Sequence, residues 1–299
     1  MGTSGKNKGS KRALTPTWVD DANPTSPPNP QPAAPAPNPS QPGQPGNPTQ
    51  PPQTPTPPRP PRVLPPLPPS TAGESLSAAR SAFSRAASGS GGGGARQGVG
   101  RAASRYVQAM GGSSSASRAM GPSRRAVAGI GQVAGVFAED GAREALRPFN
   151  LENLAGSPAS EVFIALTDVL CPDGGTIDEA IARDAVLETA AELAAGDDIA
   201  FDALTPAALE AIFLGTISRS IEAKLFNELG NGAVTLPSDV SAIQTIQNTL
   251  HDFIQGKVND AFSATGRALS SIPPAEIDRF VTTIYEGAFS LVEAFGDDS

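Results

Sequence analysis

The prolines of this chain are concentrated in one segment, and this distribution restricts which regions can fold. Of the 31 prolines in 299 residues, 23 lie between Pro16 and Pro69. Proline lacks the backbone N–H that helices and sheets use, and the neighbouring Asn, Gln and Thr residues offer too little apolar surface to offset the entropy of an ordered chain. We therefore expect residues 22–72 to form a disordered tether, about 150 Å long as a stiff polyproline II segment.

Beyond this tether, apolar residues recur at the spacing of amphipathic helices. Thr176 to Glu179 have the sequence of a capping box, and Ser157 is expected to cap a helix that begins at Pro158. The expected helices cover 123–147, 158–170, 177–195, 206–229, 238–262 and 277–295. Short connections between such helices predict an all-α fold, with an antiparallel helical bundle over residues 123–299.

Weaker helical patterns precede the bundle, over residues 75–87 and 97–110, in a segment rich in Ala, Ser, Gly and Arg. The glycines of 89–100 lack the G-x-x-x-x-G-K-[ST] order of a phosphate-binding loop and predict a linker. We expect these helices to order only against the bundle or a partner. The predicted organisation has four parts: an N-terminal recognition element over 1–21, the tether over 22–72, conditional helices over 73–122 and an acidic bundle over 123–299.

Charge is distributed as unevenly as proline. Residues 1–131 hold fourteen Lys and Arg against three acids, a net charge of +11, and the rest of the chain carries −19. Spaced arginines with one interleaved tyrosine are the strongest candidates for polyanion binding or docking, namely Arg96, Arg101, Arg105, Tyr106, Arg118, Arg124 and Arg125. They either follow phosphates, with Tyr106 stacking on a base, or dock on the acidic bundle of the same chain or of a second copy, as in a homo-oligomer.

Few residues are suited to catalysis. The single histidine, His251, is expected on a helix surface, and the single cysteine, Cys171, is expected to be a small buried residue at a helix end. One His and one Cys do not make the usual zinc ligand sets, and Asp197-Asp198 predicts solvated charge at a helix end. We expect no enzymatic activity, no catalytic residue, no metal site and no cofactor.

The sequence also predicts a cytoplasmic protein. The lone cysteine forms no disulfide within the chain, no apolar run approaches the ~18 residues of a membrane span, and no apolar segment of a secretion signal follows the basic N-terminus. The myristoylation pattern M-G-x-x-x-[ST] fails because residue 6 is Lys. We therefore expect no membrane contact.

The first 21 residues are expected to be the working end of the chain. Gly2 follows a Met that is normally removed, which would leave a small, unhindered α-amine at the end of the tether. Trp18 is the only tryptophan, and Asp20 and Asp21 follow it. A recognisable terminus on a long arm is typical of a substrate, carrier or adaptor.

Several short motifs of this chain resemble those of one known family. The motifs are Met1-Gly2-Thr3-Ser4, Leu14 to Asp21, Ser81 to Arg85, and Tyr106-Val107 with Gly111-Gly112, followed by the acidic helical region. In these residues and in its layout the chain resembles the QatB family, the associated proteins of the Qat anti-phage defence system. Residues 5–12 are more basic than the Ser/Gly run of the family, so their role stays open.

The resemblance implies partners: an ATPase, a TatD-like metal-dependent nuclease and a QueC-like enzyme. QueC enzymes activate a deazaguanine carboxylate with ATP and pass it to an amine, which suggests the Gly2 amine as the acceptor. Thr3 and Ser4 would be read by the entrance of that enzyme, and Trp18 with Asp20 and Asp21 would dock the arm. One alternative is a scaffold that joins the ATPase and the nuclease. A weaker one is a nucleic-acid sensor that uses the arginines.

Overall fold

The structure is a computed structural model, and it describes residues 72–89, 94–172, 175–230 and 240–297. The chain divides into two units, Met1–Leu64 and Pro65–Ser299, and every described residue lies in the second. The expected tether over 22–72 and the N-terminal element over 1–21 therefore lie outside the described residues, apart from Ala72.

Helices make up the second unit, and the described residues contain no β-strand, only an isolated bridge between Pro158 and Ala200. The α-helices are α1 (Ala72–Ala87), α2 (Gly94–Ala109), α3 (Ser113–Ala119), α4 (Gly121–Asp140), α5 (Ala142–Leu146), α6 (Ala159–Leu170), α7 (Ile177–Ala195), α8 (Pro206–Gly230), α9 (Val240–Ala264) and α10 (Ile277–Asp297). The prediction of an all-α fold is confirmed.

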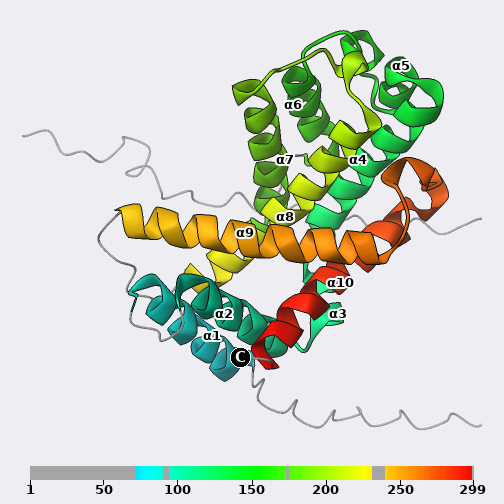
Figure 1. The fold of residues 1–299 in the computed structure, drawn as a ribbon. Coiled ribbons are helices and arrows are strands. Elements are labelled where there is room, and N and C mark those ends of the chain that lie inside the picture. The colour runs from blue at the N-terminus through cyan, green and yellow to red at the C-terminus, as the bar shows by residue number, and fades with distance from the viewer. Residues whose placement is uncertain (1–71, 90–93, 173–174, 231–239, 298–299) are drawn as a thin grey trace, which may run out of the picture. The chain divides into compact units, whose positions relative to one another are not determined.

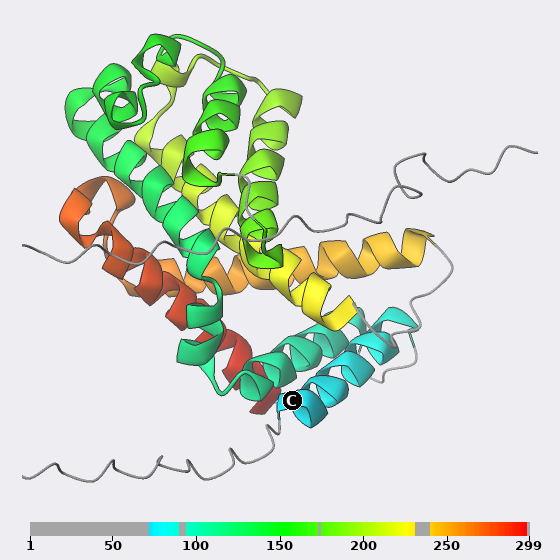
Figure 2. The ribbon, with the colours of Figure 1, turned by 180° about the vertical axis from the view of Figure 1, so that it is seen from behind.

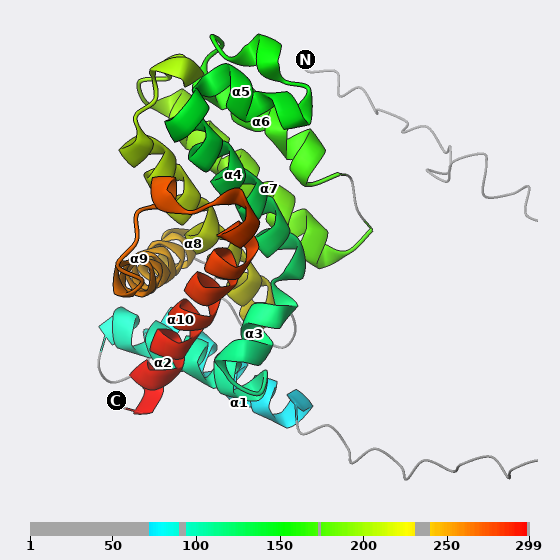
Figure 3. The ribbon, with the colours of Figure 1, turned by 90° about the vertical axis from the view of Figure 1, so that its right-hand side faces the viewer.

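The helices form two groups with α9 between them. Helices α4, α6, α7 and α8 pack side by side, while α1 and α2 pack against each other on the other side of α9 (Figure 1). Helix α10 contacts α2, α3, α4 and α9, so it connects the two groups (Figure 2). The view along α9 shows α8 and α2 on its opposite sides (Figure 3).

Helices α1 and α2 belong to the same hydrophobic core as the later helices. Phe83 of α1 and Val99 and Val107 of α2 are fully buried in it, and the Phe83 ring lies edge-on to Phe226 of α8. The packing therefore does not change at the expected boundary between residues 122 and 123. The glycines of 94–100, which were predicted to belong to a linker, form the first turns of α2.

Close packing explains why glycines are found there. A Cβ added to Gly98 would lie 2.7 Å from the Cβ of Ala86, closer than side-chain carbons approach one another. One small residue on each helix thus allows the backbones of α1 and α2 to approach closely, which larger side chains would prevent.

Local start and stop signals explain some of the helix ends. The capping box of α7 is confirmed: the Glu179 N–H donates to Thr176 Oγ1 at 3.3 Å, and the Thr176 N–H donates to the Glu179 carboxylate at 3.2 Å. The predicted helix over 123–147 is wrong as a single element. It breaks at Gly141, whose φ of 84° lies in the left-handed region that favours glycine, and α5 continues from there.

The start of α6 also differs from the prediction. Pro158, not Ser157, is the N-cap residue, and its side chain forms no capping hydrogen bond. Asp198 supplies this function from beyond α7, because its carboxylate accepts hydrogen bonds from the Ser160 N–H at 3.0 Å and the Ser160 hydroxyl at 2.5 Å. The prediction that Asp197-Asp198 is only solvated charge is therefore wrong for Asp198, which is half-buried.

Candidate functional site

A groove runs along one face of α8, between α7 and α9. It consists of two pockets of about 380 and 450 Å³ that both include Arg219. The floor belongs to α8, and small residues keep it low: Ala208, Ala211 and Gly215 follow one another at the i, i+3, i+7 spacing of a single helix face. A Cβ added to Gly215 would meet no atom within 4 Å, so the groove is open at that point.

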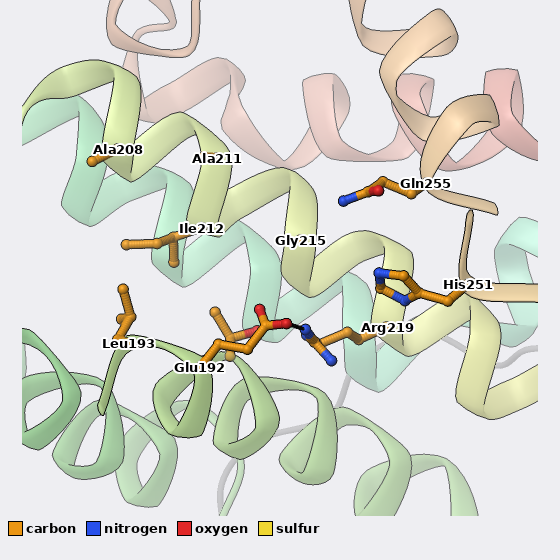
Figure 4. Close-up of a pocket in the computed structure, with 10 residues that line it drawn as sticks. Glu192, Leu193, Ala208, Ala211, Ile212, Gly215, Arg219, His251 and Gln255 are labelled. Carbon is orange, nitrogen blue, oxygen red and sulfur yellow. Dashed lines mark ion pairs between the residues drawn. The ribbon is translucent and has the colours of Figure 1, made fainter. Parts of the chain in front are cut away.

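The first pocket is shown in Figure 4. Glu192 and Leu193 enter it from α7, and His251 and Gln255 face them from α9. The second pocket continues along α8 to Phe226 and Gly230.

Arg219 lies at the junction of the two pockets and holds α8 to α7. Its guanidinium pairs with Glu192 and, at 3.4 Å, with Glu188. The arginine side chain is 13% exposed, whereas those of Glu188 and Glu192 are 62% and 66% exposed. The two carboxylates therefore form part of the rim of the groove, and the guanidinium lies below them.

His251 of α9 is hydrogen-bonded to Glu222 of α8, the helix that forms the floor of the groove. Its Nδ1 lies 2.8 Å from Glu222 Oε2, and since an ionised carboxylate only accepts hydrogen bonds, Nδ1 is the donor. Burial raises the pKa of Glu222 above its usual value, and the hydrogen bond from His251 opposes this shift. His251 thus has a hydrogen-bonding partner that orients its ring and lies on a pocket, the two features that a general acid or base needs.

The predicted arginine set is divided among several roles. Arg96, Arg105, Arg118 and Arg125 are exposed and suited to docking, whereas Arg101 and Arg124 are half-buried. Arg124 donates to Thr282 of α10 at 3.1 Å, so it contributes to the packing of α4 on α10. The docking role of these arginines stays a prediction.

Tyr106 does not have the exposure that base stacking requires. It is 1% exposed in the core, and burial is the main reason why its pKa lies far above the usual value. The prediction that this ring stacks on a nucleic acid is therefore wrong. Its helical spacing from Val99 and Ala103 on the same helix face already signalled a core position.

Cys171 is 6% exposed, and burial raises the pKa of its thiol to about 11. Within the described residues, no group of three or more His, Cys, Asp and Glu side chains is placed to bind a metal ion. None of the described helices is both long and apolar enough to cross a membrane.

One known protein family matches most of this helical unit. The family described as "Qat anti-phage system associated protein QatB" matches residues 111–292, which is more than half of the chain. The chain belongs to the QatB family. The resemblance found in the sequence is thereby confirmed, and QatB membership makes the chain a component of the Qat anti-phage system.

The QatB match begins just before α3 and ends within α10, so it includes the groove but neither α1 nor α2. No curated protein and no solved structure matches the chain. The predicted acceptor Gly2 and the recognition residues Thr3, Ser4, Trp18, Asp20 and Asp21 lie outside both the match and the described residues.

Proposed function

We propose that this QatB-family protein is a non-catalytic component of the Qat system and acts as a substrate or adaptor. Its N-terminal Gly2 would accept an acyl group from a QueC-like partner. The observation that carries the proposal is the QatB match over residues 111–292, taken together with the Gly2-Thr3-Ser4 terminus and the proline-rich segment that separates it from the helical unit.

The chemistry of a QueC-like partner supports an amine acceptor. Such an enzyme converts a deazaguanine carboxylate and ATP into an acyl adenylate and pyrophosphate. The Gly2 amine would then attack the acyl carbon, forming an amide bond as the acyl–phosphate bond breaks; AMP leaves, and the amine loses a proton. Glycine suits this step because it has no Cβ to obstruct the approach of its nitrogen.

The state of the described side chains is consistent with a non-catalytic role. Cys171 is a poor nucleophile, since a thiol with a pKa of about 11 is almost entirely protonated near pH 7. The Lys224 ammonium is held between Asp178 at 2.7 Å and Glu228 at 3.1 Å, where it joins α7 to α8. Lys224 is thus used to hold α7 and α8 together.

Intact-mass analysis tests the proposal. The full chain is expressed with its QueC-like, ATPase and nuclease partners, and the mature N-terminus is identified first. We expect a mass increase on a peptide that begins at Gly2. The increase should persist in Gly2→Ala, which keeps a primary amine, and disappear in Gly2→Pro, whose ring hinders its secondary amine. An unmodified Gly2 in cells that resist phage would refute the acceptor role.

The same cells separate this role from that of a scaffold. A scaffold joining the ATPase and the nuclease needs the helical unit but not a particular terminus, so Gly2→Pro would leave defence intact. We expect Gly2→Pro to abolish defence while the level of the protein is unchanged.

A further inference from the structure

The proposed function does not involve the groove along α8. We propose that the groove binds a cationic amphipathic helix of a partner protein. The partner helix would lie lengthwise on α8, with its apolar side on the floor and its Lys or Arg side chains along α7.

Charge gives the first argument. Asp184, Glu188 and Glu192 follow one another at intervals of four residues, which places three carboxylates in one row along the α7 rim. Glu222 of α8 is a further carboxylate, which is hydrogen-bonded to His251 of α9, and Arg219 is the one guanidinium among the residues that line the two pockets. Asp184 is exposed. The α7 side of the groove thus favours a cation.

The opposite rim has a different composition. Helix α9 contributes Gln247, His251 and Gln255 to the two pockets, and none of them is an acid. A bound segment would therefore meet the row of α7 carboxylates on one side and, from α9, amide and imidazole groups on the other. This asymmetry fixes which side of an amphipathic ligand carries the basic residues.

The floor determines the shape of the ligand. The i, i+3, i+7 spacing of Ala208, Ala211 and Gly215 recurs in Ala223, Phe226 and Gly230, so one face of α8 lines the groove for about 33 Å. Gly215 is notable because glycine inside a helix is about 1 kcal/mol less favourable than alanine. No neighbouring atom occupies the space where its side chain would be.

Backbone hydrogen bonding distinguishes a helix from an extended peptide. The walls and the floor are helices, whose backbone groups are already paired, and the described residues offer no strand edge to which an extended peptide could add. A helical ligand brings its own backbone hydrogen bonds and needs only side-chain contacts. The row of carboxylates also disfavours nucleic acid in this groove.

Peptide binding to the full chain tests the proposal. The probe is a fluorescent peptide of about 22 residues, long enough as a helix to cover the groove, with Leu at helical spacing and Lys elsewhere. The matched peptide has Glu in place of Lys. We expect the Lys peptide to bind, measured by fluorescence anisotropy, with affinity that falls as salt rises, and the Glu peptide to bind at least about tenfold more weakly.

Two matched pairs of variants locate the site. Gly215→Phe fills the open floor, whereas Gly256→Phe adds the same ring on α9 where nothing lies within 4 Å and no groove residue is involved. Asp184→Lys reverses a rim charge, whereas Asp260→Lys makes the same change on an exposed α9 residue outside both pockets.

Gly215→Phe and Asp184→Lys should each weaken binding of the Lys peptide by about tenfold or more, which corresponds to 1.4 kcal/mol. The two control variants should bind as the unaltered chain does. The proposal is wrong if the Lys peptide does not bind, if the Glu peptide binds as tightly, or if both variants of a pair behave alike. None of these outcomes bears on Gly2, whose modification is read from mass.

Discussion

The hydroxyl of Tyr285 in α10 donates a hydrogen bond to the hydroxyl of Ser220 in α8, with the two oxygens 2.7 Å apart and both residues fully buried. The direction follows from the second contact of Ser220, whose hydroxyl already donates to the Ile217 carbonyl at 2.8 Å. Two helices that are distant in the sequence are thus joined by a polar contact inside the core.

This contact predicts unequal effects of removing either partner. Tyr285→Phe deletes the donor and leaves Ser220 bonded to Ile217, so it should lower the free energy of unfolding by about 1 kcal/mol. Ser220→Ala leaves the phenol hydroxyl buried without an acceptor and should cost about 1–3 kcal/mol. Urea unfolding measures both, and the double variant should resemble Tyr285→Phe alone. A smaller loss for Ser220→Ala than for Tyr285→Phe would contradict the assigned direction.

The Asp198–Ser160 contact predicts a dependence of stability on pH. The hydrogen bonds from Ser160 hold the pKa of Asp198 below its usual value, which is about 3.9 for aspartate. A lowered folded-state pKa contributes stability that is fully present above the usual value and is lost as the pH falls through the folded-state pKa. Asp198→Asn should therefore lower the melting temperature at pH 7. The difference from the unaltered chain should shrink below about pH 3.5.

A second variant checks that the effect belongs to the start of α6. Ser160→Ala removes the hydroxyl donor but keeps the backbone N–H, which also donates a hydrogen bond to Asp198. Its loss of stability at pH 7 should be smaller than that of Asp198→Asn. If the difference in melting temperature between Asp198→Asn and the unaltered chain were the same at pH 7 and at pH 3, the carboxylate charge would not be involved.

Two glycines should respond in opposite ways to the same substitution. Alanine favours a helix interior over glycine by about 1 kcal/mol, and at Gly215 nothing opposes this gain. We expect Gly215→Ala to raise the free energy of unfolding by up to about 1 kcal/mol. At Gly98 the new methyl group would meet Ala86, whose short side chain cannot move aside, so overpacking of about 1–3 kcal/mol outweighs the gain. Denaturant unfolding of both variants measures the opposite signs, and a gain in stability for Gly98→Ala would refute the close α1–α2 contact.

Signals contained in a few neighbouring residues were readable from the sequence. The capping box at Thr176 is complete within four residues, and the start of α8 at Pro206 follows Thr205, whose hydroxyl accepts a hydrogen bond from the Ala208 N–H at 3.1 Å. These two motifs depend on local geometry alone, and the structure has them where the sequence predicts them. The cap predicted at Ser157 differs, because the distant Asp198 takes its place at the start of α6.

Contacts between distant residues were not readable. Asp198 is 38 residues from Ser160, and Glu222 is 29 residues from His251. Their pairing depends on how α6 to α9 pack, which no short motif specifies. The groove could not be predicted for the same reason. The acids of α7 and the small residues of α8 line one surface only once the two helices lie side by side. Tyr106 is a different case, since its helical spacing was visible in the sequence but its ring was assigned to base stacking instead of to the core.

Cys171 provides the last prediction, which concerns reactivity. Burial raises the pKa of its thiol to about 11, although the charges of Arg183 and Arg125 act in the opposite direction. Only the thiolate reacts with iodoacetamide, so the rate of alkylation of the native chain should rise about tenfold per pH unit from pH 7 to pH 10. In urea-unfolded chain the rate should instead level off near pH 8.5, the usual value for a free cysteine. Mass spectrometry of samples quenched at intervals measures both rates. A native rate that levels off near pH 8.5 would mean that Cys171 reacts as an exposed thiol and that the end of α6 is not closed as the structure has it.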